Sequence, residues 1–329
     1  MMLLEMAAGG FGDRVAVGSL DDGLTVKQIF DHSGKAAKRF RDANVENVAM
    51  IDITSPALPI CLFGASWAGL PFVPLNYRLA NQELDVLLER ISPSIALMQP
   101  ETQERISDGS NIKTVNRDDL LASTDSEEMP TDWSMDGEDT AILLFTSGTT
   151  GEPKAAVLRQ RHLVSYILGS VEFMSASEEE AALISVPPYH IAGIAATLSN
   201  LYAGRRVVQL PEFDAKKWIE LVRSESITSA MVVPTMLSRI VDHLLSEGTD
   251  SEGLPTLRAI SYGGGKMPQP TIEAALELLP DTNFVNAYGL TETSSTDPWQ
   301  NFGIFFIDEL NAYTPVSYTH LTLPTICSV

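Results

Sequence analysis

Basic residues, cysteines and long hydrophobic runs are all scarce in this sequence. Its 329 residues contain 22 Lys and Arg against 43 Asp and Glu, which gives a formal net charge of -21. No Lys/Arg-rich block is present that could neutralise a run of phosphates, so nucleic acid is not an expected partner. Only Cys61 and Cys327 occur, too few for a disulfide framework or a cysteine metal site.

The sequence also lacks the features of membrane insertion and export. No apolar window approaches the length of a membrane span, and the start MMLLEMAAGGFGD has no basic region of the kind that opens a signal peptide. We therefore expect a cytoplasmic protein. Hydrophobic residues make up 44% of the chain, enough for buried cores, and the length favours about two domains.

The most informative stretch is Leu143–Leu158, which reads LLFTSGTTGEPKAAVL. An apolar segment breaks abruptly into a turn, and a second apolar segment follows, so we predict a strand, a turn and a strand. The turn and the cation after it comprise Thr146, Ser147, Gly148, Thr149, Thr150, Gly151 and Lys154. Glycines let successive backbone amides point inward, while the hydroxyls and the lysine add donors and positive charge. This composition indicates a polyphosphate-binding loop rather than an ordinary solvent-facing turn.

Spacing excludes two other phosphate-binding motifs. A Walker loop has glycine directly before its lysine and a hydroxyl directly after it, whereas Pro153 precedes Lys154 and Ala155 follows it. A GxGxxG turn that started at Gly263 would end at Pro268, which lacks the backbone amide that such a turn offers to a dinucleotide.

The rest of the chain alternates strand-like and helix-like segments, which predicts an α/β fold with a parallel, doubly wound sheet. Helices are expected from Thr25 to Ala43 and over Ser55–Gly69. Strands are expected at Val15–Gly18, Val48–Ile53, Ser94–Met98, Ala182–Val186, Arg206–Gln209, Ser229–Val233, Ala259–Tyr262 and Asn283–Asn286. The acidic segment Asp118–Asp139 has no sustained period, so we expect an exposed loop with solvated carboxylates rather than a metal site.

Three of the expected strands end in residues that can do chemistry. His190 follows a double proline at a strand end, where open α/β sheets place their ligands, although a lone histidine can also be a core residue. A second strand runs into Gly263, Gly264 and Gly265, and the last one into Asn286, Tyr288, Gly289, Thr291 and Glu292. The last set is able to stack a base, hydrogen-bond a phosphate oxygen and bind magnesium.

The stretches SGTTGEPK, PPYHIAG and AYGLTET occur in this order, together with VPLNYRL at Val73–Leu79 and VPTML at Val233–Leu237. In this combination the sequence resembles the adenylate-forming superfamily of acyl-CoA synthetases, peptide-synthetase adenylation domains and luciferases, from about Phe11 to Thr296. The resemblance implies two similar doubly wound sheets that form the large N-terminal domain of such an enzyme. It also implies a two-step ligase that activates a carboxylic acid, here expected to be a fatty or related acid, with ATP and passes the acyl group to a thiol, usually coenzyme A.

The resemblance also implies roles by position. Thr146–Gly151 and Lys154 would surround the β- and γ-phosphates, and His190 would lie beside the acyl and carboxylate pocket. Gly263–Gly265 would run along the adenine and the acyl chain. Asn286 and Tyr288 would hold the adenine in a turn that includes Gly289, Thr291 would contact the α-phosphate, and Glu292 would bind magnesium. The implied catalytic set is Thr146, Lys154, His190, Thr291 and Glu292, acting on ATP, magnesium and coenzyme A.

The sequence departs from the family pattern at Ala155, where glycine is usual, and at Lys266, where proline is usual. The family's ribose-binding aspartate, hinge and small C-terminal domain with its catalytic lysine are not found, so we expect an incomplete domain that is inactive in the full reaction. Pro315–Leu321 can be back-translated to a run like a sequencing-library transposon end, so residues 315–329 are expected to be a non-native tail. Within 1–314, we expect a first subdomain at about 55–175 and a second at about 176–300 that also takes 1–54.

Other functional classes stay open. Gly64–Ala68 is one residue from a GxSxG nucleophile elbow, which would suggest a serine hydrolase, but Ser66 lies in a small-residue helical stretch and fits packing better. A non-catalytic nucleotide-binding fragment, or adenylation of an acid for an acceptor other than coenzyme A, is also compatible with the motifs. ATP-dependent pyrophosphate exchange would separate a ligase from a hydrolase or a binding module. The sequence does not identify the acid or the oligomeric state.

Overall fold

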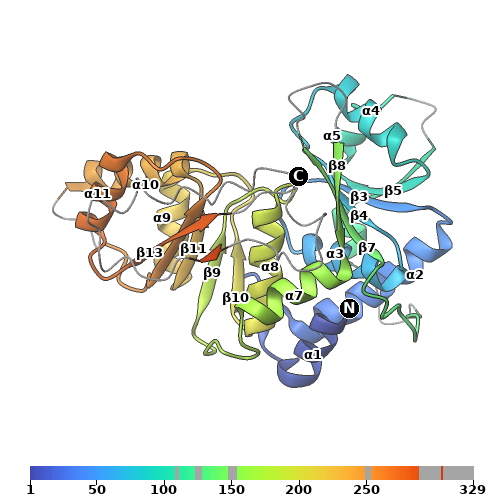
Figure 1. The fold of residues 1–329 in the computed structure, drawn as a ribbon, viewed down its shortest axis with the longest axis horizontal. Helices are drawn as coiled ribbons and strands as arrows, with labels where there is room; N and C mark the ends of the chain where they lie inside the picture. The colour runs from blue at the N-terminus through green and yellow to red at the C-terminus, as the bar shows by residue number, and fades with distance from the viewer. Residues whose placement is uncertain (108–110, 123–127, 147–153, 249–252, 289–304, 307–329) are drawn as a thin grey trace, which may run out of the picture.

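The computed structural model describes residues 1–107, 111–122, 128–146, 154–248, 253–288 and 305–306. Its strands form two sheets that lie beside each other, with helices between and around them (Figure 1). The larger sheet has eight strands in the order β14-β13-β12-β11-β9-β10-β1-β2, and the smaller has six in the order β6-β5-β3-β4-β7-β8. Non-consecutive neighbours in both sheets mean that the chain crosses over between strands, as parallel pairing requires.

The eight-stranded sheet is parallel except at its ends. It is made of β1 (Val15–Val17), β2 (Leu24–Thr25), β9 (Ala181–Ile184), β10 (Arg206–Gln209), β11 (Ser229–Val232), β12 (Ala259–Gly263), β13 (Asn283–Tyr288) and β14 (Phe305–Phe306). Only the outermost strands β2 and β14 pair antiparallel. Its crossover helices are α8 (Ile191–Ala203), α9 (Ala215–Ser224), α10 (Pro234–Glu247) and α11 (Gln269–Leu278).

The six-stranded sheet is parallel apart from one hairpin. It is made of β3 (Asn47–Ile51), β4 (Phe72–Pro74), β5 (Ser94–Met98), β6 (Ile112–Val115), β7 (Thr140–Thr146) and β8 (Lys154–Arg159). Strand β8 folds back antiparallel on β7. The helices of this half and of the N-terminus are α1 (Met2–Phe11), α2 (Val26–Asp42), α3 (Ala57–Ala68), α4 (Asn81–Arg90), α5 (Pro100–Gln103), α6 (Arg117–Leu121) and α7 (Gln160–Ser170).

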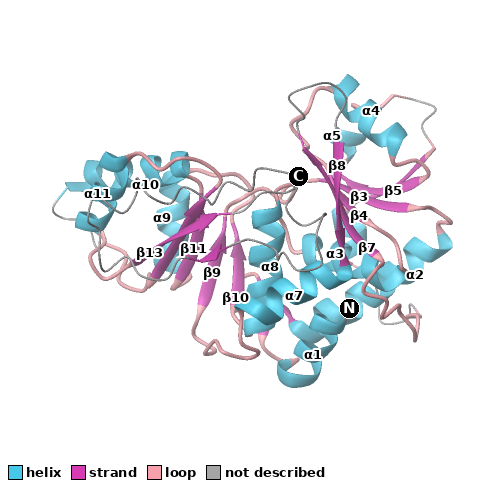
Figure 2. Cartoon of the chain, in the orientation of Figure 1, coloured by secondary structure: helices cyan, strands magenta, loops and turns pink. Residues whose placement is uncertain are grey.

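Helices cover both faces of each sheet (Figure 2). On one face of the eight-stranded sheet, Trp218 of α9 and Leu237 of α10 belong to the same buried cluster as the strand residue Val232. On one face of the six-stranded sheet, Leu84 of α4 belongs to a cluster with Ala49. Because neighbouring strand residues point to opposite faces, both sheets are doubly wound, as predicted.

The third buried cluster belongs to both sheets at once. It contains residues of α1, α2, α3, α7 and α8, together with Met50 of the six-stranded sheet and Ile184 and Val207 of the eight-stranded one. The two sheets therefore share a core in addition to the one that each keeps on its other face. Among the described helices, none is both long and apolar enough to cross a membrane.

Local sequence signals explain several of these elements. Helix α2 starts after Thr25, whose Oγ1 accepts the Gln28 amide at 3.1 Å while Gln28 Oε1 accepts the Thr25 amide at 2.8 Å. This reciprocal capping satisfies two amides that a helix start leaves unpaired. The expected helix after Thr25 is confirmed, as are the strand Ser94–Met98 and the two strands on either side of the hydroxyl-rich turn.

Two expectations need correction. The acidic segment Asp118–Asp139 is not a loop throughout, because α6 extends into it, with Asn116 Oδ1 accepting the Asp119 amide at 2.7 Å as its cap. Strand β3 lies before the expected boundary at residue 55 but pairs in the six-stranded sheet, with Val48 in register with Phe72 and Ile95. From the N-terminal segment, β1 and β2 join the eight-stranded sheet as expected.

Candidate functional site

Residues that the sequence singles out lie at one edge of the eight-stranded sheet. His190 follows β9, Gly263 ends β12, and Asn286 lies near the end of β13. Strand β12 runs parallel to β13, with Gly263 in register with Ala287. Since the carboxyl ends of parallel strands meet at the same edge, the structure brings these three positions to the edge where open α/β sheets bind ligands.

A tight turn fixes His190 at this edge. The His190 amide donates to the Pro187 carbonyl at 3.2 Å, and the His190 carbonyl accepts the Gly193 amide at 3.0 Å as α8 begins. A Cβ on Gly193 would lie 2.9 Å from the Pro187 oxygen. The PPYHIAG stretch is therefore a compact strand-to-helix turn in which glycine is the residue that fits.

The His190 turn contacts the other sheet through aromatic rings. The ring centroids of Tyr189 and His190 are 4.7 Å apart, and those of Tyr189 and Tyr77 are 5.7 Å apart in an edge-to-face arrangement. Tyr77 follows β4, so this contact joins the carboxyl edges of the two sheets. Partial desolvation of the His190 side chain lowers its pKa, which favours the neutral imidazole. Desolvation raises the pKa of Tyr189, against a smaller opposite effect of the Arg78 charge.

The glycine run after β12 is required by close backbone packing. A Cβ on Gly263 would lie 2.2 Å from the Ala287 carbonyl oxygen, a distance that no side chain can occupy. Gly264 has a φ of +80°, in the left-handed region that favours glycine. The next residue, Gly265, runs along the start of α10, where a Cβ would lie 3.8 Å from Pro234 Cγ. These glycines leave a backbone surface without side chains at the sheet edge.

The predicted phosphate loop leaves the six-stranded sheet at the matching edge. Thr146 and Lys154 are in register at the end of the β7–β8 hairpin where the connecting loop begins and ends. Strand β7 runs parallel to β4, with Phe72 in register with Ile142, so the loop starts at the same edge as Tyr77. Lys154 is exposed and forms no ion pair with any other described residue. In a chain of net charge -21, an exposed cation without an ion-pair partner among the described residues can attract an anionic ligand.

Several predicted residues lie outside the described part of the chain. These are Ser147, Gly148, Thr149, Thr150, Gly151, Gly289, Thr291 and Glu292. Thr146 and Tyr288 end β7 and β13, and their side chains are also outside it. The described residues contain no group of three or more His, Cys, Asp or Glu that could hold a metal ion. The assignment of magnesium to Glu292 therefore stays a prediction.

Arg78 is a feature of this edge that the sequence analysis missed. Its guanidinium carbon lies 5.3 Å from the Tyr77 ring centroid, and it forms no ion pair with the described residues. Arg105 fixes the backbone on both sides of Arg78, because its guanidinium donates to the carbonyls of Tyr77 at 2.8 Å and Leu79 at 2.5 Å. The available signal was an arginine just after a strand in an acidic chain, within the VPLNYRL stretch.

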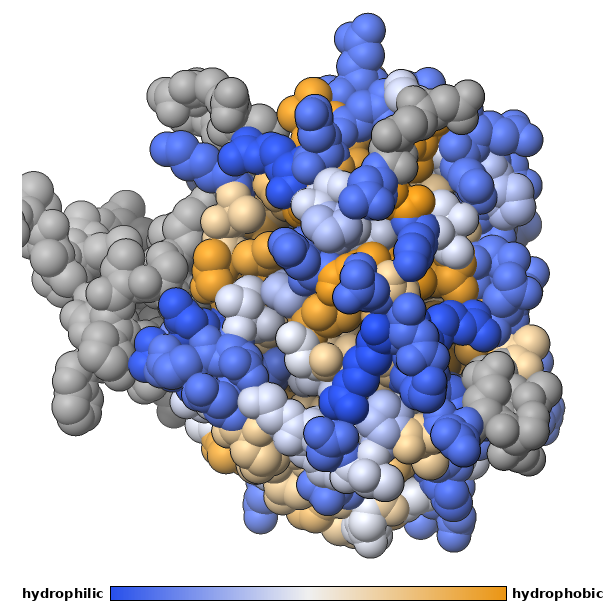
Figure 3. All heavy atoms as spheres, turned by 90° about the vertical axis from the view of Figure 1, so that its right-hand side faces the viewer, coloured by the Kyte–Doolittle hydropathy of each residue, from blue (hydrophilic) through white to orange (hydrophobic). Residues whose placement is uncertain are grey.

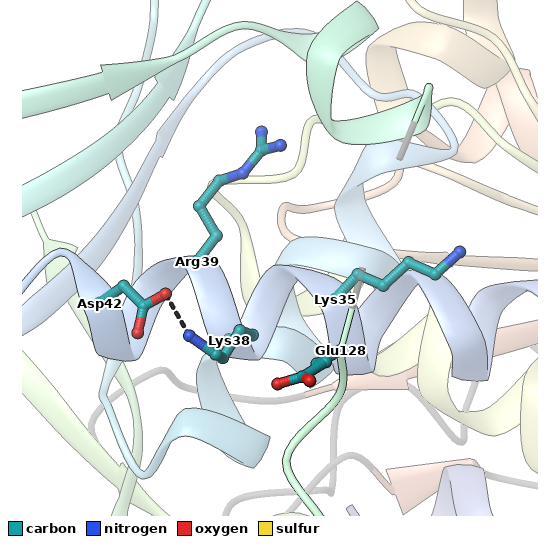
Figure 4. A pocket seen from close by; sticks show the side chains of 5 residues that line it. All are labelled: Lys35, Lys38, Arg39, Asp42 and Glu128. Carbon is teal, nitrogen blue, oxygen red and sulfur yellow. Dashed lines mark hydrogen bonds and ion pairs between the residues drawn. The ribbon is translucent and has the colours of Figure 1, made fainter. Parts of the chain in front are cut away.

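The described chain also has a pocket on α2. Its volume is about 400 Å³, and its lining carries both charges and includes the ion pair between Lys38 and Asp42 (Figure 4). Its lining residues are Lys35, Lys38, Arg39, Asp42 and Glu128. On the face in Figure 3, hydrophilic side chains interrupt the hydrophobic ones.

The hydrolase alternative is not supported. Ser66 lies inside α3 rather than between a strand and a helix, and its Oγ accepts the Gln160 side-chain amide at 3.0 Å. A nucleophile elbow needs its serine on a sharp strand-to-helix turn. The packing role expected for Ser66 agrees with this position.

Known proteins resemble this chain along most of its length. Fatty acid–[acyl-carrier-protein] ligase ScoC of Streptomyces coeruleorubidus is 29% identical over 286 residues, covering 83% of this chain and 54% of the relative. Feruloyl-CoA synthase of an Amycolatopsis species is 30% identical over 277 residues, covering 82% of this chain and 55% of the relative. The chain thus spans about half the length of these curated relatives.

A solved structure has the same architecture. The o-succinylbenzoate CoA synthetase of Bacillus subtilis, in complex with the acyl-adenylate intermediate OSB-AMP, matches with a TM-score of 0.71 and 25% identity. The match covers 89% of this chain and 59% of that one. In addition, the family model for the AMP-binding enzyme matches residues 4–308. Fold and sequence agree, and the chain belongs to the AMP-binding enzyme family.

Proposed function

We propose that this chain carries the adenylating part of an AMP-forming acid–thiol ligase, an acyl-CoA synthetase. In the first step, a carboxylate oxygen attacks the α-phosphorus of ATP, the bond to the bridging oxygen of the β-phosphate breaks, and pyrophosphate leaves. In the second step, the sulfur of coenzyme A attacks the acyl carbon and AMP leaves. Feruloyl-CoA synthase is named for the second product, and the Bacillus structure contains an intermediate of the first kind.

The observation that carries the proposal is the ring contact between Tyr77 and Tyr189. It brings the His190 turn of the eight-stranded sheet to the edge of the six-stranded sheet from which the β7–β8 loop leaves. An adenylating enzyme must hold a carboxylate next to a triphosphate. A loop rich in amide and hydroxyl donors on one side and a histidine on the other supply these two halves, and catalysis then rests on positioning.

A neutral His190 suits the first step. A protonated imidazole beside the acid would form an ion pair with the carboxylate and hold back the electron pair that must attack phosphorus. Desolvation lowers the pKa of His190 and so favours the neutral ring, which orients the carboxylate by a single hydrogen bond. We therefore assign His190 to orientation of the acid and not to proton transfer.

The phosphates and the nucleotide have separate partners in this proposal. Lys154 and the loop Thr146–Gly151 neutralise and hold the β- and γ-phosphates. Asn286, Tyr288 and Gly289 hold the adenine beside the side-chain-free surface of Gly263–Gly265, and Thr291 contacts the α-phosphate. Magnesium, when bound, supplies positive charge to the phosphates, and Glu292 is its proposed ligand. The proposed unit is residues 1–314, with the chain's last fifteen residues as a tail outside the described part.

The proposed acid and acceptor rest on the names of the relatives. We choose a fatty or related acid, because the relative from Streptomyces coeruleorubidus is named as a fatty acid ligase. That relative is also named for an acyl-carrier protein, so a carrier-protein thiol is the second candidate acceptor. A cytoplasmic location fits both acceptors.

Exchange of labelled pyrophosphate into ATP tests the first step. The test uses a full-length version with the family's C-terminal domain, because the 329-residue chain is expected to be inactive in the full reaction. We expect this version to exchange pyrophosphate in a way that depends on the acid, measured over a panel of fatty, aryl and short-chain acids. Nucleotide binding without exchange for any acid would instead indicate a binding module. Thioester formation from the preferred acid is then measured with two acceptors, coenzyme A and a carrier protein with its phosphopantetheine arm. The acceptor that gives the faster reaction is the preferred one.

Substitutions of Glu292 and Lys154 test the assigned roles. Glu292→Gln keeps the shape and removes the charge, and we expect it to slow pyrophosphate exchange about a hundredfold and to weaken its magnesium dependence. Lys154→Met should have a smaller effect, since amides and hydroxyls of the same loop also contact the phosphates. An unchanged magnesium titration in Glu292→Gln would remove this residue from the site.

A further inference from the structure

Buried polar atoms without partners gather where the two sheets meet. Thr54 Oγ1, Ser55 Oγ and Gln209 Oε1 are shielded from solvent and have no hydrogen-bond partner among the described residues. Thr54 and Ser55 are only 1% and 5% exposed. Buried polar groups in folded proteins are nearly always paired, because an unpaired one has lost its water without replacement. Gln209 contacts Ser55 across the two sheets, and Thr54 precedes Ser55 in the chain, so all three unpartnered atoms belong to residues of this junction.

The three residues come from the carboxyl edges of both sheets. Thr54 and Ser55 follow β3 and precede α3, and Gln209 is the last residue of β10. Gln209 Nε2 donates to the Ser55 carbonyl oxygen at 3.0 Å, and this oxygen also accepts the Leu58 amide at 2.9 Å. The contact joins the two sheets through a side chain whose other polar atom is unpaired.

The orientation of the Gln209 amide is fixed by this contact. If its oxygen and nitrogen exchanged places, the oxygen would face the Ser55 carbonyl oxygen and two acceptors would meet. Oε1 therefore remains an acceptor that lacks a donor. It is bonded to the same carbon as Nε2, so it lies close to Ser55, whose carbonyl oxygen Nε2 contacts.

We propose that Thr54, Ser55 and Gln209 form a binding site for ordered internal water between the two sheets. Water donates one hydrogen to Gln209 Oε1 and another to a hydroxyl oxygen, and it accepts the hydrogen of the second hydroxyl. No carboxylate belongs to this set, which favours a neutral ligand over a cation. The site does not depend on which acid or acceptor the protein uses.

A crystal structure that resolves ordered water, with a second crystal soaked in rubidium chloride, tests the site directly. We expect density within hydrogen-bonding distance of both Gln209 Oε1 and Ser55 Oγ, and no anomalous peak there. An anomalous peak close to these oxygens would show that a monovalent cation, and not water, occupies the site. A Ser55 or Thr54 hydroxyl that donates straight to Gln209 Oε1, with no density between them, would show a dry junction. Either of these two results overturns the proposal.

The sign of one stability change gives an independent test. Thr54→Val keeps the side-chain shape and removes the hydroxyl. In a hydrated site it deprives the water of a partner, and we expect the Tm to fall by about 2 °C. In a dry site it removes an unpaired buried hydroxyl, so the Tm would stay or rise, and that result contradicts the proposal. Ser94→Ala is the matched control, because Ser94 Oγ is likewise buried and unpaired in the described chain but lies at the amino end of β5, away from the carboxyl edges that meet at this junction.

Discussion

The carboxyl edges of the two sheets are built by different means. At the edge of the eight-stranded sheet, backbone packing decides the structure: Gly193 and Gly263 sit where a Cβ would meet a carbonyl oxygen. At the edge of the six-stranded sheet, charged side chains dominate. Arg117 holds the buried Asp52 through Nε and Nη2, both at 2.9 Å, and Arg105 holds the loop of Arg78.

The difference separates two tasks of a reaction site. Backbone turns that admit no other residue fix positions to a fraction of an ångström, which suits the acid and the adenine. Charged side chains suit neutralisation of the phosphates in the proposed reaction, because their distances adjust more easily. We expect substitutions at the first edge to act mainly on folding, and substitutions of unpaired cations at the second to act mainly on ligands.

The largest effect is expected at Gly263. Gly263→Ala would place its Cβ 2.2 Å from the Ala287 oxygen, so β12 and β13 must separate locally, and we expect the free energy of unfolding to fall by about 3 kcal/mol. Urea denaturation measures it. Gly169→Ala on α7 is the control, because nothing lies within 4 Å of the added methyl. That change should raise stability by about 0.5 to 1 kcal/mol. Equal urea midpoints for Gly263→Ala and the parent would contradict the role of backbone packing at this edge.

The ion pair at the other edge should matter nearly as much. Arg117→Ala leaves Asp52, only 4% exposed in its side chain, without a counter-ion, and we expect a loss of about 2 kcal/mol. The partial exposure of Arg117 keeps the loss below that of a fully buried pair. Lys38→Ala breaks an exposed ion pair with Asp42 and should cost less than about 0.5 kcal/mol. Similar losses in both variants would mean that the buried pair has no special role.

A pH-dependent effect is expected at His162, just after the β7–β8 hairpin. His162 Nδ1 accepts the Arg159 amide at 3.1 Å, which requires the neutral ring. Desolvation, followed by the charges of Arg161 and Arg159, lowers the pKa of His162 below its ordinary 6.5. The unfolded chain therefore takes up the proton first as the pH falls. The stabilisation is complete above about pH 6.5 and is lost as the pH falls through the folded value.

The size of this effect can be isolated with one variant. We expect about 1 kcal/mol more loss between pH 7.5 and pH 5 in the parent than in His162→Gln, which keeps an acceptor but does not titrate in this range. Chemical denaturation at both pH values measures the difference, and it cancels the contribution of the many carboxylates. Parallel pH curves for the two proteins would contradict this role of His162.

The smallest effect on folding is expected at Arg78. Arg78→Met removes a cation above the Tyr77 ring at an exposed position, so stability should change by about 0.5 kcal/mol or less. If the charge serves a ligand, binding of ATP or of coenzyme A should weaken about tenfold, since hydrogen bonds to charged groups contribute that much. Calorimetric titration of each compound tests this. Unchanged affinity for both would leave Arg78 without a function at this edge.

Local sequence patterns predicted individual helices and strands better than the contacts between distant ones. The strand Ser94–Met98 and the helix after Thr25 are found with nearly the predicted limits, because an apolar run and a capping pair are encoded within a few residues. Helix α1 was not predicted. It has no side-chain cap, carries two glycines, and is held by tertiary packing of residues such as Leu4 and Phe11.

The same division applies to the site. The sequence placed His190, Gly263 and Asn286 at strand ends, and the parallel order of the strands brings them to one edge. It did not predict the contact of Tyr77 with Tyr189 or that of Ser55 with Gln209. Both join segments more than a hundred residues apart, and no periodicity in one segment contains information about its distant neighbour.

The pairing of β1 with β10 has a consequence for folding of the protein during its synthesis. Val17 is in register with Val207, about 190 residues later in the chain. At the usual speed of translation, β1 and the apolar helix before it must wait roughly 10 to 40 s on the ribosome before β10 is synthesised. During that time β1 can pair only with β2, and α2 can pack on α3, but the rest of the eight-stranded sheet has not been synthesised. The strand order therefore delays completion of the larger sheet until more than half of the chain has left the ribosome.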